Sequence, residues 1–316
     1  MTGELSCFAL ESAGNSLFLP LMKRIRLPVY FYALTAMLFW GMSFIWSSVL
    51  LKYYEPVTII FIRLIISSVL LFAFIRVAGA RERIDRGDYL LIFLSALFNP
   101  FLYFLGENYG LKFSTPTIAA VIIATIPVFS PLVAYLSFRE KLTPINFVGI
   151  AVSFAGVVMI LVNRSFELAA DPRGVLFLFA AVFAALLYSV TLRKLTGKYS
   201  AVLIVAVQNL IGVFLFLPLF LVFEYKSTMA VPLNGEIISS MLLLAVFASS
   251  LSFVFFAHSV KLLGISKTNI FSNLIPVFTA LFSYFLLSES FSLHKIIGVL
   301  IVIGGVYLSE RTKKRA

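Results

Sequence analysis

Two ionisable residues, Arg63 and Glu107, lie well inside long apolar stretches of the sequence. A charge inside a membrane helix costs about 2.5–3.5 kcal/mol on insertion scales, so it is expected to have a partner or a function. A rise of about 1.5 Å per residue, counted from expected helix ends at residues 57 and 111, places Arg63 about 9 Å and Glu107 about 6 Å below the same membrane surface. We therefore predict an intramembrane ion pair. It either links two helices structurally or opens when a solute or a proton binds.

Two of the apolar stretches carry polar side chains at every fourth position, which places each group on one face of a helix. The groups are Asn99, Tyr103 and Glu107 in one stretch, and Asn269 and Asn273 in another. In a lipid-bathed helix such a face must contact protein or a water-filled cavity, because lipid offers no hydrogen-bond partner. Trp40 and Tyr188 would add aromatic walls to such a cavity. These residues are the candidate binding set, and helix–helix packing is the competing interpretation for each.

The sequence lacks the residues that disulfide, metal or enzyme chemistry would need. The single cysteine, Cys7, excludes a disulfide framework and a thiolate metal cluster, and two histidines are too few for a histidine-rich metal site. The sequence contains no nucleotide-binding lysine loop, no glycine-rich dinucleotide turn and no HExxH motif. We therefore expect no enzyme activity, no metal and no cofactor.

The composition places all of these residues in a membrane. Of the 316 residues, 61% are hydrophobic and 12% are charged, whereas soluble domains are roughly 45–50% apolar and roughly 25% charged. The mean hydropathy is +1.04. A chain with so little charge cannot cover a water-exposed surface, which excludes a soluble enzyme, a disordered protein and a nucleic-acid-binding domain.

Ten apolar stretches are long enough to cross a bilayer as helices, which takes roughly 20 residues each. They span residues 30–51, 57–77, 89–111, 115–137, 144–162, 174–192, 201–223, 237–260, 267–288 and 293–309. The stretches lack the alternating polar residues of a transmembrane barrel. The sequence therefore predicts an all-α integral membrane protein with ten transmembrane helices.

The basic residues in the connections set the expected orientation. With the N-terminus in the cytoplasm, 18 of the 25 Lys and Arg residues fall on the cytoplasmic side and 6 on the outer side. This asymmetry predicts cytoplasmic N- and C-termini in a multi-pass protein of the cell (inner or plasma) membrane. It also accounts for the net charge of +11 without an acidic partner such as nucleic acid. Residues 1–27 are expected to form a flexible N-terminal extension, and residues 311–316 a basic cytoplasmic tail.

The chain contains an internal repeat at an offset of 149 residues. Its clearest matches are Ile126-Pro127-Val128-Phe129 with Ile275-Pro276-Val277-Phe278, Glu140 with Glu289, and Gly149 with Gly298. Each half holds five stretches, and an odd number makes the second half enter the membrane from the opposite side. We therefore predict two inverted five-helix repeats, residues 28–162 and 163–310, with a binding site near mid-depth between them. Pro127 and Pro276 would be either hinges or static bends.

These features resemble the drug/metabolite transporter superfamily, and specifically the bacterial EamA-type carriers. The resemblance covers roughly residues 28–310 and rests on the two repeated Pro–Glu–Gly elements, on Phe39-Trp40-Gly41 and on Arg63. It implies ten helices with both termini in the cytoplasm. It also implies export or exchange of small metabolites, amino acids or drugs.

The function that these residues favour is secondary transport of a small neutral or zwitterionic organic solute by alternating access. Exporter, exchanger and proton-coupled modes all stay open. A sugar-phosphate or nucleotide-sugar exchanger would need several converging Lys or Arg residues, and only Arg63 lies at depth. A lipid-handling or enzymatic membrane protein would need clustered Asp, Glu or His at one interface. We expect the site on the first, third, sixth and ninth stretches.

Overall fold

The computed structural model describes residues 29–79, 82–129, 133, 144–161, 170–263, 268, 271–288 and 293–309. These residues are helical or lie in short connections, and no strand occurs among them. Some of the residues discussed above lie outside the described part of the chain. They are residues 1–27, Glu140, Asn269, Glu289 and residues 311–316.

Six helices in the described residues are long and apolar enough to cross a membrane. They are Tyr30–Leu50, Pro56–Val77, Arg86–Lys112, Pro172–Thr196, Ala201–Met229 and Gly235–Leu263. Four shorter apolar helices are Pro116–Phe129, Phe147–Met159, Phe271–Leu287 and Ile296–Gly305. Each of these helices overlaps one of the predicted stretches, and the described part of the chain is a helical bundle with several helices able to cross a membrane.

Several of the long helices are composite, because short 3₁₀ or π-helical turns interrupt regular α-helix. The elements are α2 (Val29–Leu50), α3 (Pro56–Val77), η1 (Arg86–Asp88), α4 (Tyr89–Ala96), η2 (Leu97–Leu102), α5 (Tyr103–Lys112), α6 (Pro116–Ile123), α8 (Pro144–Leu161), α9 (Pro172–Thr196), α10 (Ala201–Leu219), η3 (Phe220–Glu224), α11 (Tyr225–Met229), α12 (Gly235–Leu243), η4 (Leu244–Ser252), α13 (Phe253–Leu263), η5 (Phe271–Leu274), α15 (Ile275–Leu287) and α16 (Leu293–Ser309). Of these, η2, η3 and η4 are π-helical. Turns of this kind often occur at functional sites.

Local sequence explains where many of these helices begin. Proline occupies the first turn of α3, α6 and α9, where its missing N–H has no intrahelical partner to lose. Polar residues cap the starts of α6, α10 and α12, because their side-chain oxygens accept a hydrogen bond from an exposed backbone N–H. These residues are Thr115 for α6, Ser200 for α10 and Asn234 for α12.

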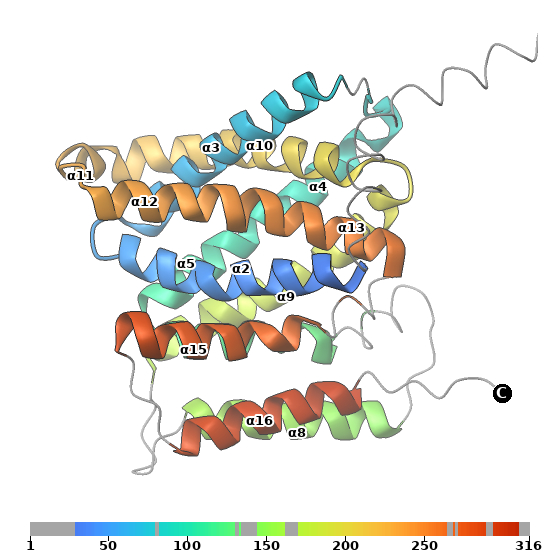
Figure 1. Ribbon diagram of the computed structural model, residues 1–316, viewed down its shortest axis with the longest axis vertical. Helices are drawn as coiled ribbons and strands as arrows, with labels where there is room; N and C mark the ends of the chain where they lie inside the picture. Colours follow the sequence, from blue (N-terminus) through green and yellow to red (C-terminus); the bar gives the residue numbers. More distant parts are fainter. Residues whose placement is uncertain are drawn as a thin grey trace, which may run out of the picture.

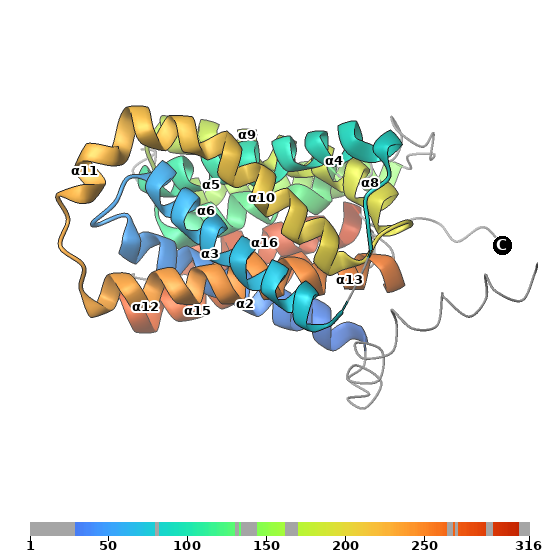
Figure 2. The ribbon, with the colours of Figure 1, turned by 90° about the horizontal axis from the view of Figure 1, so that it is seen from above.

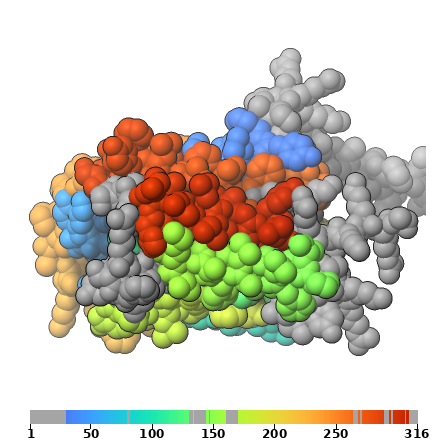
Figure 3. Space-filling model, turned by 90° about the horizontal axis from the view of Figure 1, so that it is seen from below, coloured from blue at the N-terminus to red at the C-terminus, as the bar shows by residue number. Residues whose placement is uncertain are grey.

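The helices run side by side across the long axis of the molecule (Figure 1). At one end of that axis α3 packs against α10, as Figure 2 shows from above. At the opposite end α8 packs against α16, and the two lie side by side on the face in Figure 3. Helices α2, α5 and α9 lie between these pairs. The interior of the bundle is therefore closed by one helix pair at each end.

The α8–α16 pair depends on glycine. A Cβ added at Gly156 would lie 2.7 Å from the backbone nitrogen of Val302, so only glycine allows the two backbones this close. Helices α5 and α9 approach each other in the same way, because a Cβ at Gly106 would lie 2.6 Å from the carbonyl oxygen of Phe177. Small residues at such crossings are the usual means of tight packing between membrane helices, where lipid offers no hydrophobic driving force.

Candidate functional site

A pocket lies inside the bundle, and the pocket with its mouth holds about 740 Å³. Side chains from α2, α3, η2, α5, α6, α9, η4, α13, η5 and α15 line it. Six of the predicted residues are in this lining. They are Trp40, Arg63, Asn99, Tyr103, Glu107 and Tyr188. Residues that are far apart in the sequence thus meet around one pocket.

Arg63 and Glu107 form the charged part of this lining. The Nη2 atom of Arg63 lies 3.8 Å from Oε2 of Glu107, and both side chains are almost fully buried. The hydroxyl of Tyr103 donates a hydrogen bond of 3.0 Å to Oε1 of Glu107. The guanidinium carbon of Arg63 lies 3.6 Å from the centre of the Phe104 ring, which is a cation–π contact. The predicted ion pair is therefore present, but its two groups are too far apart to share a hydrogen bond.

Two nitrogens of Arg63 have no hydrogen-bond partner. The side chain is 2% exposed, and its Nε and Nη2 atoms are buried without an acceptor. A buried donor that makes no hydrogen bond costs roughly 1–3 kcal/mol, and more when the group is charged.

Aromatic rings form much of the remaining wall. The ring of Trp40 packs at 5.0 Å from Phe253 and 5.1 Å from Phe256, measured between ring centres. Tyr188 lines the pocket and donates a hydrogen bond of 3.4 Å to Oε1 of Gln208. The arrangement can hold a small, mostly apolar molecule that carries a polar or charged group.

The third helix is irregular at the point where its polar residues line the pocket. Asn99 has extended backbone angles (φ −146°, ψ 119°) inside the π-helical turn η2, next to Pro100. Its side chain is buried and lines the pocket, as do Tyr103 and Glu107 one and two turns later. The third helix is therefore broken next to Pro100, and the break lies in the pocket wall.

Other predicted residues have different surroundings. Asn273 is buried in η5 and is not part of the pocket lining, whereas its neighbour Ser272 is. Pro127 follows a break at Ala124 and Thr125 after α6, and Pro276 lies in the first turn of α15 after the 3₁₀ turn η5. Both prolines thus stand at the start of a new helical segment, where proline is well tolerated.

The sequence reasoning did not find the contribution of the eighth helix. Ala248 and Ser249 of the π-helical turn η4, together with Phe253 and Phe256 of α13, line the pocket. The hydroxyl of Ser249 is buried without a hydrogen-bond partner. A serine or phenylalanine in an apolar stretch carries no distinctive spacing, and only tertiary packing selects these positions. A run of small polar residues, Ser249-Ser250-Leu251-Ser252, is the one local signal.

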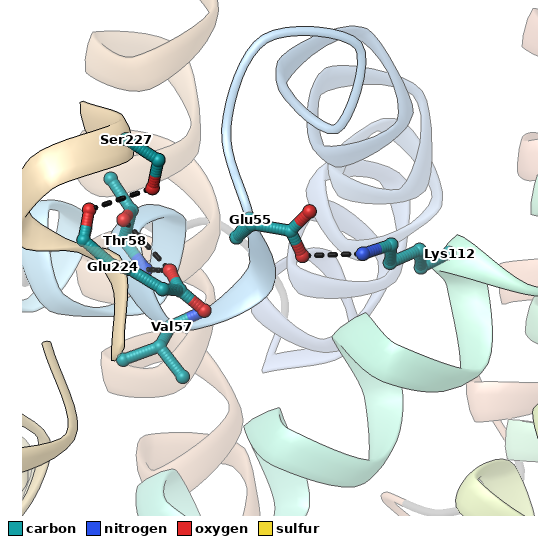
Figure 4. Close-up of polar contacts among 6 residues, drawn as sticks. All are labelled: Glu55, Val57, Thr58, Lys112, Glu224 and Ser227. Carbon is teal, nitrogen blue, oxygen red and sulfur yellow. Dashed lines mark hydrogen bonds and ion pairs between the residues drawn. The ribbon is translucent and has the colours of Figure 1, made fainter. Parts of the chain in front are cut away.

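Glu224 is a second buried carboxylate, and its position differs from the predicted one. The seventh stretch was expected to end at residue 223, which would leave Glu224 at the membrane surface. Instead the helix continues to Met229, and Glu224 is 4% exposed. Its Oε2 atom accepts hydrogen bonds from the backbone nitrogen (2.6 Å) and the hydroxyl (2.8 Å) of Thr58, and Oε1 accepts one of 3.2 Å from the nitrogen of Val57 (Figure 4).

Glu224 therefore caps α3 from another helix. Glu55, the residue at the N-cap position of α3, makes no capping hydrogen bond and pairs instead with Lys112 (Figure 4). A carboxylate at a helix N-terminus satisfies free N–H groups and interacts well with the helix dipole. The Glu224 carboxylate thus joins α3 to the end of the α10–η3–α11 helix.

The opposite end of the same helix pair has a reciprocal contact. The carboxylate of Glu82, which follows α3, accepts hydrogen bonds of 2.9 and 3.1 Å from the backbone nitrogen of Ser200 at the start of α10. Nearby, Asp88 accepts hydrogen bonds from Lys198 (2.8 Å) and from the hydroxyl of Tyr199 (2.7 Å). The hydrogen bond to Asp88 raises the pKa of Lys198 above its usual value. Acidic residues therefore tie α3 to α10 at both ends.

Comparison with known proteins identifies relatives in sequence and in fold. The model of the EamA-like transporter family matches residues 27–162 and again residues 172–311. An uncharacterized transporter of Archaeoglobus fulgidus is 27% identical over 86% of this chain and 94% of its own length. Another, of Methanothermobacter thermautotrophicus, is 29% identical over 90% of this chain and 86% of its own length. A solved crystal structure superposes with a TM-score of 0.68 at 18% identity, covering 90% of this chain and 98% of that one, which shows a shared fold.

Proposed function

The chain belongs to the EamA-like transporter family, and we propose that it is a secondary carrier for a small neutral or zwitterionic organic solute. It would work by alternating access, as an exporter or an exchanger. The protein is a membrane transporter by family and by its relatives. The solute and the mode of transport are the proposed part.

The pocket is the observation that carries this proposal. It is lined by elements from both halves of the chain, and its charged lining residues, among those described, are one base and one acid. Such a balance suits a solute with no net charge, because it leaves the occupied site nearly neutral. A phosphate-bearing solute would need several converging cations, and Arg63 is the cation in this lining.

An inverted repeat would supply the two states that alternating access requires. We propose ten spans in two five-helix repeats, residues 28–162 and 163–310, with both termini in the cytoplasm. Helix packing supports this arrangement, because contacts in one half have counterparts after the halves are exchanged. Thus α2 packs on α15 as α9 packs on α6, and α2 packs on α13 as α9 packs on α5. The pairs α3–α10 and α8–α16 would each lie on the axis, since exchange maps each onto itself.

Movement between the two states would use the breaks near the repeated prolines. Pro127 and Pro276 occupy equivalent places in the two repeats, and each follows a short irregular turn. A few residues at the end of an element can absorb the backbone change of a hinge. We propose these turns as the hinges.

Counterflow in proteoliposomes tests the carrier function. Vesicles containing the purified protein and preloaded with one unlabelled solute would be mixed with the same labelled solute, using amino acids, sugars and nucleosides in turn. A carrier accumulates label transiently above equilibrium, whereas protein-free vesicles do not. Folded protein that gives no counterflow with any solute class would count against secondary transport.

A further inference from the structure

We propose that Gln208 is a positioning residue for the solute site. Held in place by Ser95, it fixes the hydroxyl of Tyr188, so that the Tyr188 ring forms a rigid part of the pocket wall. Tyr188 lines the pocket, whereas Gln208 and Ser95 are not part of the lining. The inference rests on the proposed carrier function, because these two residues would act on solute binding without touching the solute.

A chain of buried hydrogen bonds leads from Tyr188 to two neighbouring helices. The Tyr188 hydroxyl donates to Oε1 of Gln208 at 3.4 Å, and Nε2 of Gln208 donates to the hydroxyl of Ser95 at 2.6 Å. The Thr191 hydroxyl lies 3.0 Å from the Ser95 hydroxyl and 2.8 Å from the carbonyl oxygen of Tyr188. All four side chains are buried. The chain therefore ties α9, which carries Tyr188, to α4 and α10.

The order of these contacts explains how the ring is held. The short bond to Ser95 fixes the Gln208 amide, because one end of the amide is then attached to α4. The other end receives the Tyr188 hydroxyl, which is the far end of that side chain. A ring anchored both at its backbone and at its hydroxyl cannot swing about its side-chain bonds, and buried polar networks whose members satisfy one another are rigid in this way.

Gln208 has the place in α10 that Arg63 has in α3. Each is the eighth residue of its helix, counted from Ala201 and from Pro56, and the two helices pack against each other. Arg63 lines the pocket itself, whereas Gln208 reaches the lining through Tyr188. An amide suits this role because it donates with one end and accepts with the other, without placing a second charge beside the pocket.

A fluorine label on Tyr188 tests the positioning without any solute. The full-length protein would carry 3-fluorotyrosine in place of Tyr188, and its ¹⁹F NMR signal would be recorded in detergent. We expect Gln208→Leu to move the signal by more than its linewidth, because the phenol loses its hydrogen-bond partner. Ser95→Ala should move it in the same direction, because the amide of Gln208 is then no longer fixed. If Gln208→Leu does not fold, Ser95→Ala decides the question.

Thr228→Val is the matched control for the loss of a buried polar group. The Thr228 hydroxyl is buried and donates to the carbonyl oxygen of Glu224 at 2.8 Å, and it is not part of the pocket lining. The fluorine signal of Tyr188 should stay in place in this variant.

Counterflow kinetics test the effect on solute binding, with labelled leucine, glucose and uridine as the probes. For a probe that the wild-type protein carries, we expect the half-maximal concentration to rise roughly 3- to 10-fold in Gln208→Leu, the value of one lost neutral hydrogen bond. The rate at saturating solute should change much less, because the lost interaction serves binding. Tyr188→Phe should have the same effect. The double variant should add little to it, because both substitutions remove the same bond.

The outcomes separate this inference from the carrier function. An unmoved fluorine signal in both Gln208→Leu and Ser95→Ala would overturn the positioning role. An unchanged half-maximal concentration in Gln208→Leu and Tyr188→Phe would also overturn it, and so would equal changes in Thr228→Val. If none of the probes shows counterflow, the carrier function fails, and the fluorine measurement alone decides whether Gln208 positions Tyr188.

Discussion

Replacing Glu224 with glutamine tests whether a buried carboxylate holds the start of α3. The Glu224 carboxylate accepts three hydrogen bonds, two from backbone nitrogens of α3 and one from the hydroxyl of Thr58. Glutamine keeps one acceptor oxygen and places an amide N–H₂ against one of these donors. The loss is one hydrogen bond to a charged group and the charge–dipole attraction, together roughly 2–4 kcal/mol.

Glu55→Gln is the matched control, because Glu55 precedes the same helix but lies on the surface. Its side chain is 46% exposed and pairs with Lys112, and an exposed ion pair contributes about 0–1 kcal/mol. Both variants would be unfolded reversibly with increasing mole fractions of sodium dodecyl sulfate in mixed micelles, and the free energies of unfolding compared. We expect Glu224→Gln to be destabilised by at least about 1 kcal/mol more than Glu55→Gln. Equal effects would refute the idea that burial makes the Glu224 cap strong.

Two further predictions concern the pocket and the helix packing. In a background without the native cysteine, Asn99→Cys should react with small water-soluble thiol reagents, and a transported solute should protect it. The control is Leu70→Cys, which should stay unreactive because Leu70 is 41% exposed on the lipid-facing side. An unreactive Asn99→Cys would place the pocket out of reach of water. Gly156→Ala should lower the free energy of unfolding by about 1–3 kcal/mol, because its Cβ would overlap α16. Gly304→Ala is the control and should have little effect, because its Cβ would meet nothing within 4 Å. Similar losses in both variants would contradict this account of the α8–α16 contact.

Much of the pocket could be predicted from the sequence because its charged and polar residues interrupt otherwise apolar stretches. Arg63 and Glu107 are charges in apolar stretches, and regular helix rise together with short connections puts them at similar depth, where they form an ion pair. Trp40, Tyr103 and Tyr188 were predicted from polar or aromatic character on helix faces and line the pocket. Their role in binding a solute stays a prediction.

The remaining parts depend on partners that are distant in the sequence. Glu224 looks like an interfacial residue next to the end of an apolar run, and the groups that it caps lie 166 and 167 positions away. Phe253 enters the pocket only because the π-helical turn η4 precedes it and α13 packs against α2. Asn273 has the expected polar character, but the 3₁₀ turn η5 leaves its neighbour Ser272 in the lining instead.

The reciprocal contacts between α3 and α10 bear on how the pocket could open. Glu224 binds the start of α3 in a buried site, whereas the contact of Glu82 with the start of α10 is exposed. Water can replace an exposed hydrogen bond at little cost but cannot replace a buried one, so the Glu224 contact holds α3 more firmly than the Glu82 contact holds α10. Arg63 belongs to this pair, while Glu107 lies on α5, beyond the irregular turn at Asn99. The Arg63–Glu107 ion pair therefore joins the α3–α10 pair to α5, across the pocket wall that both side chains line.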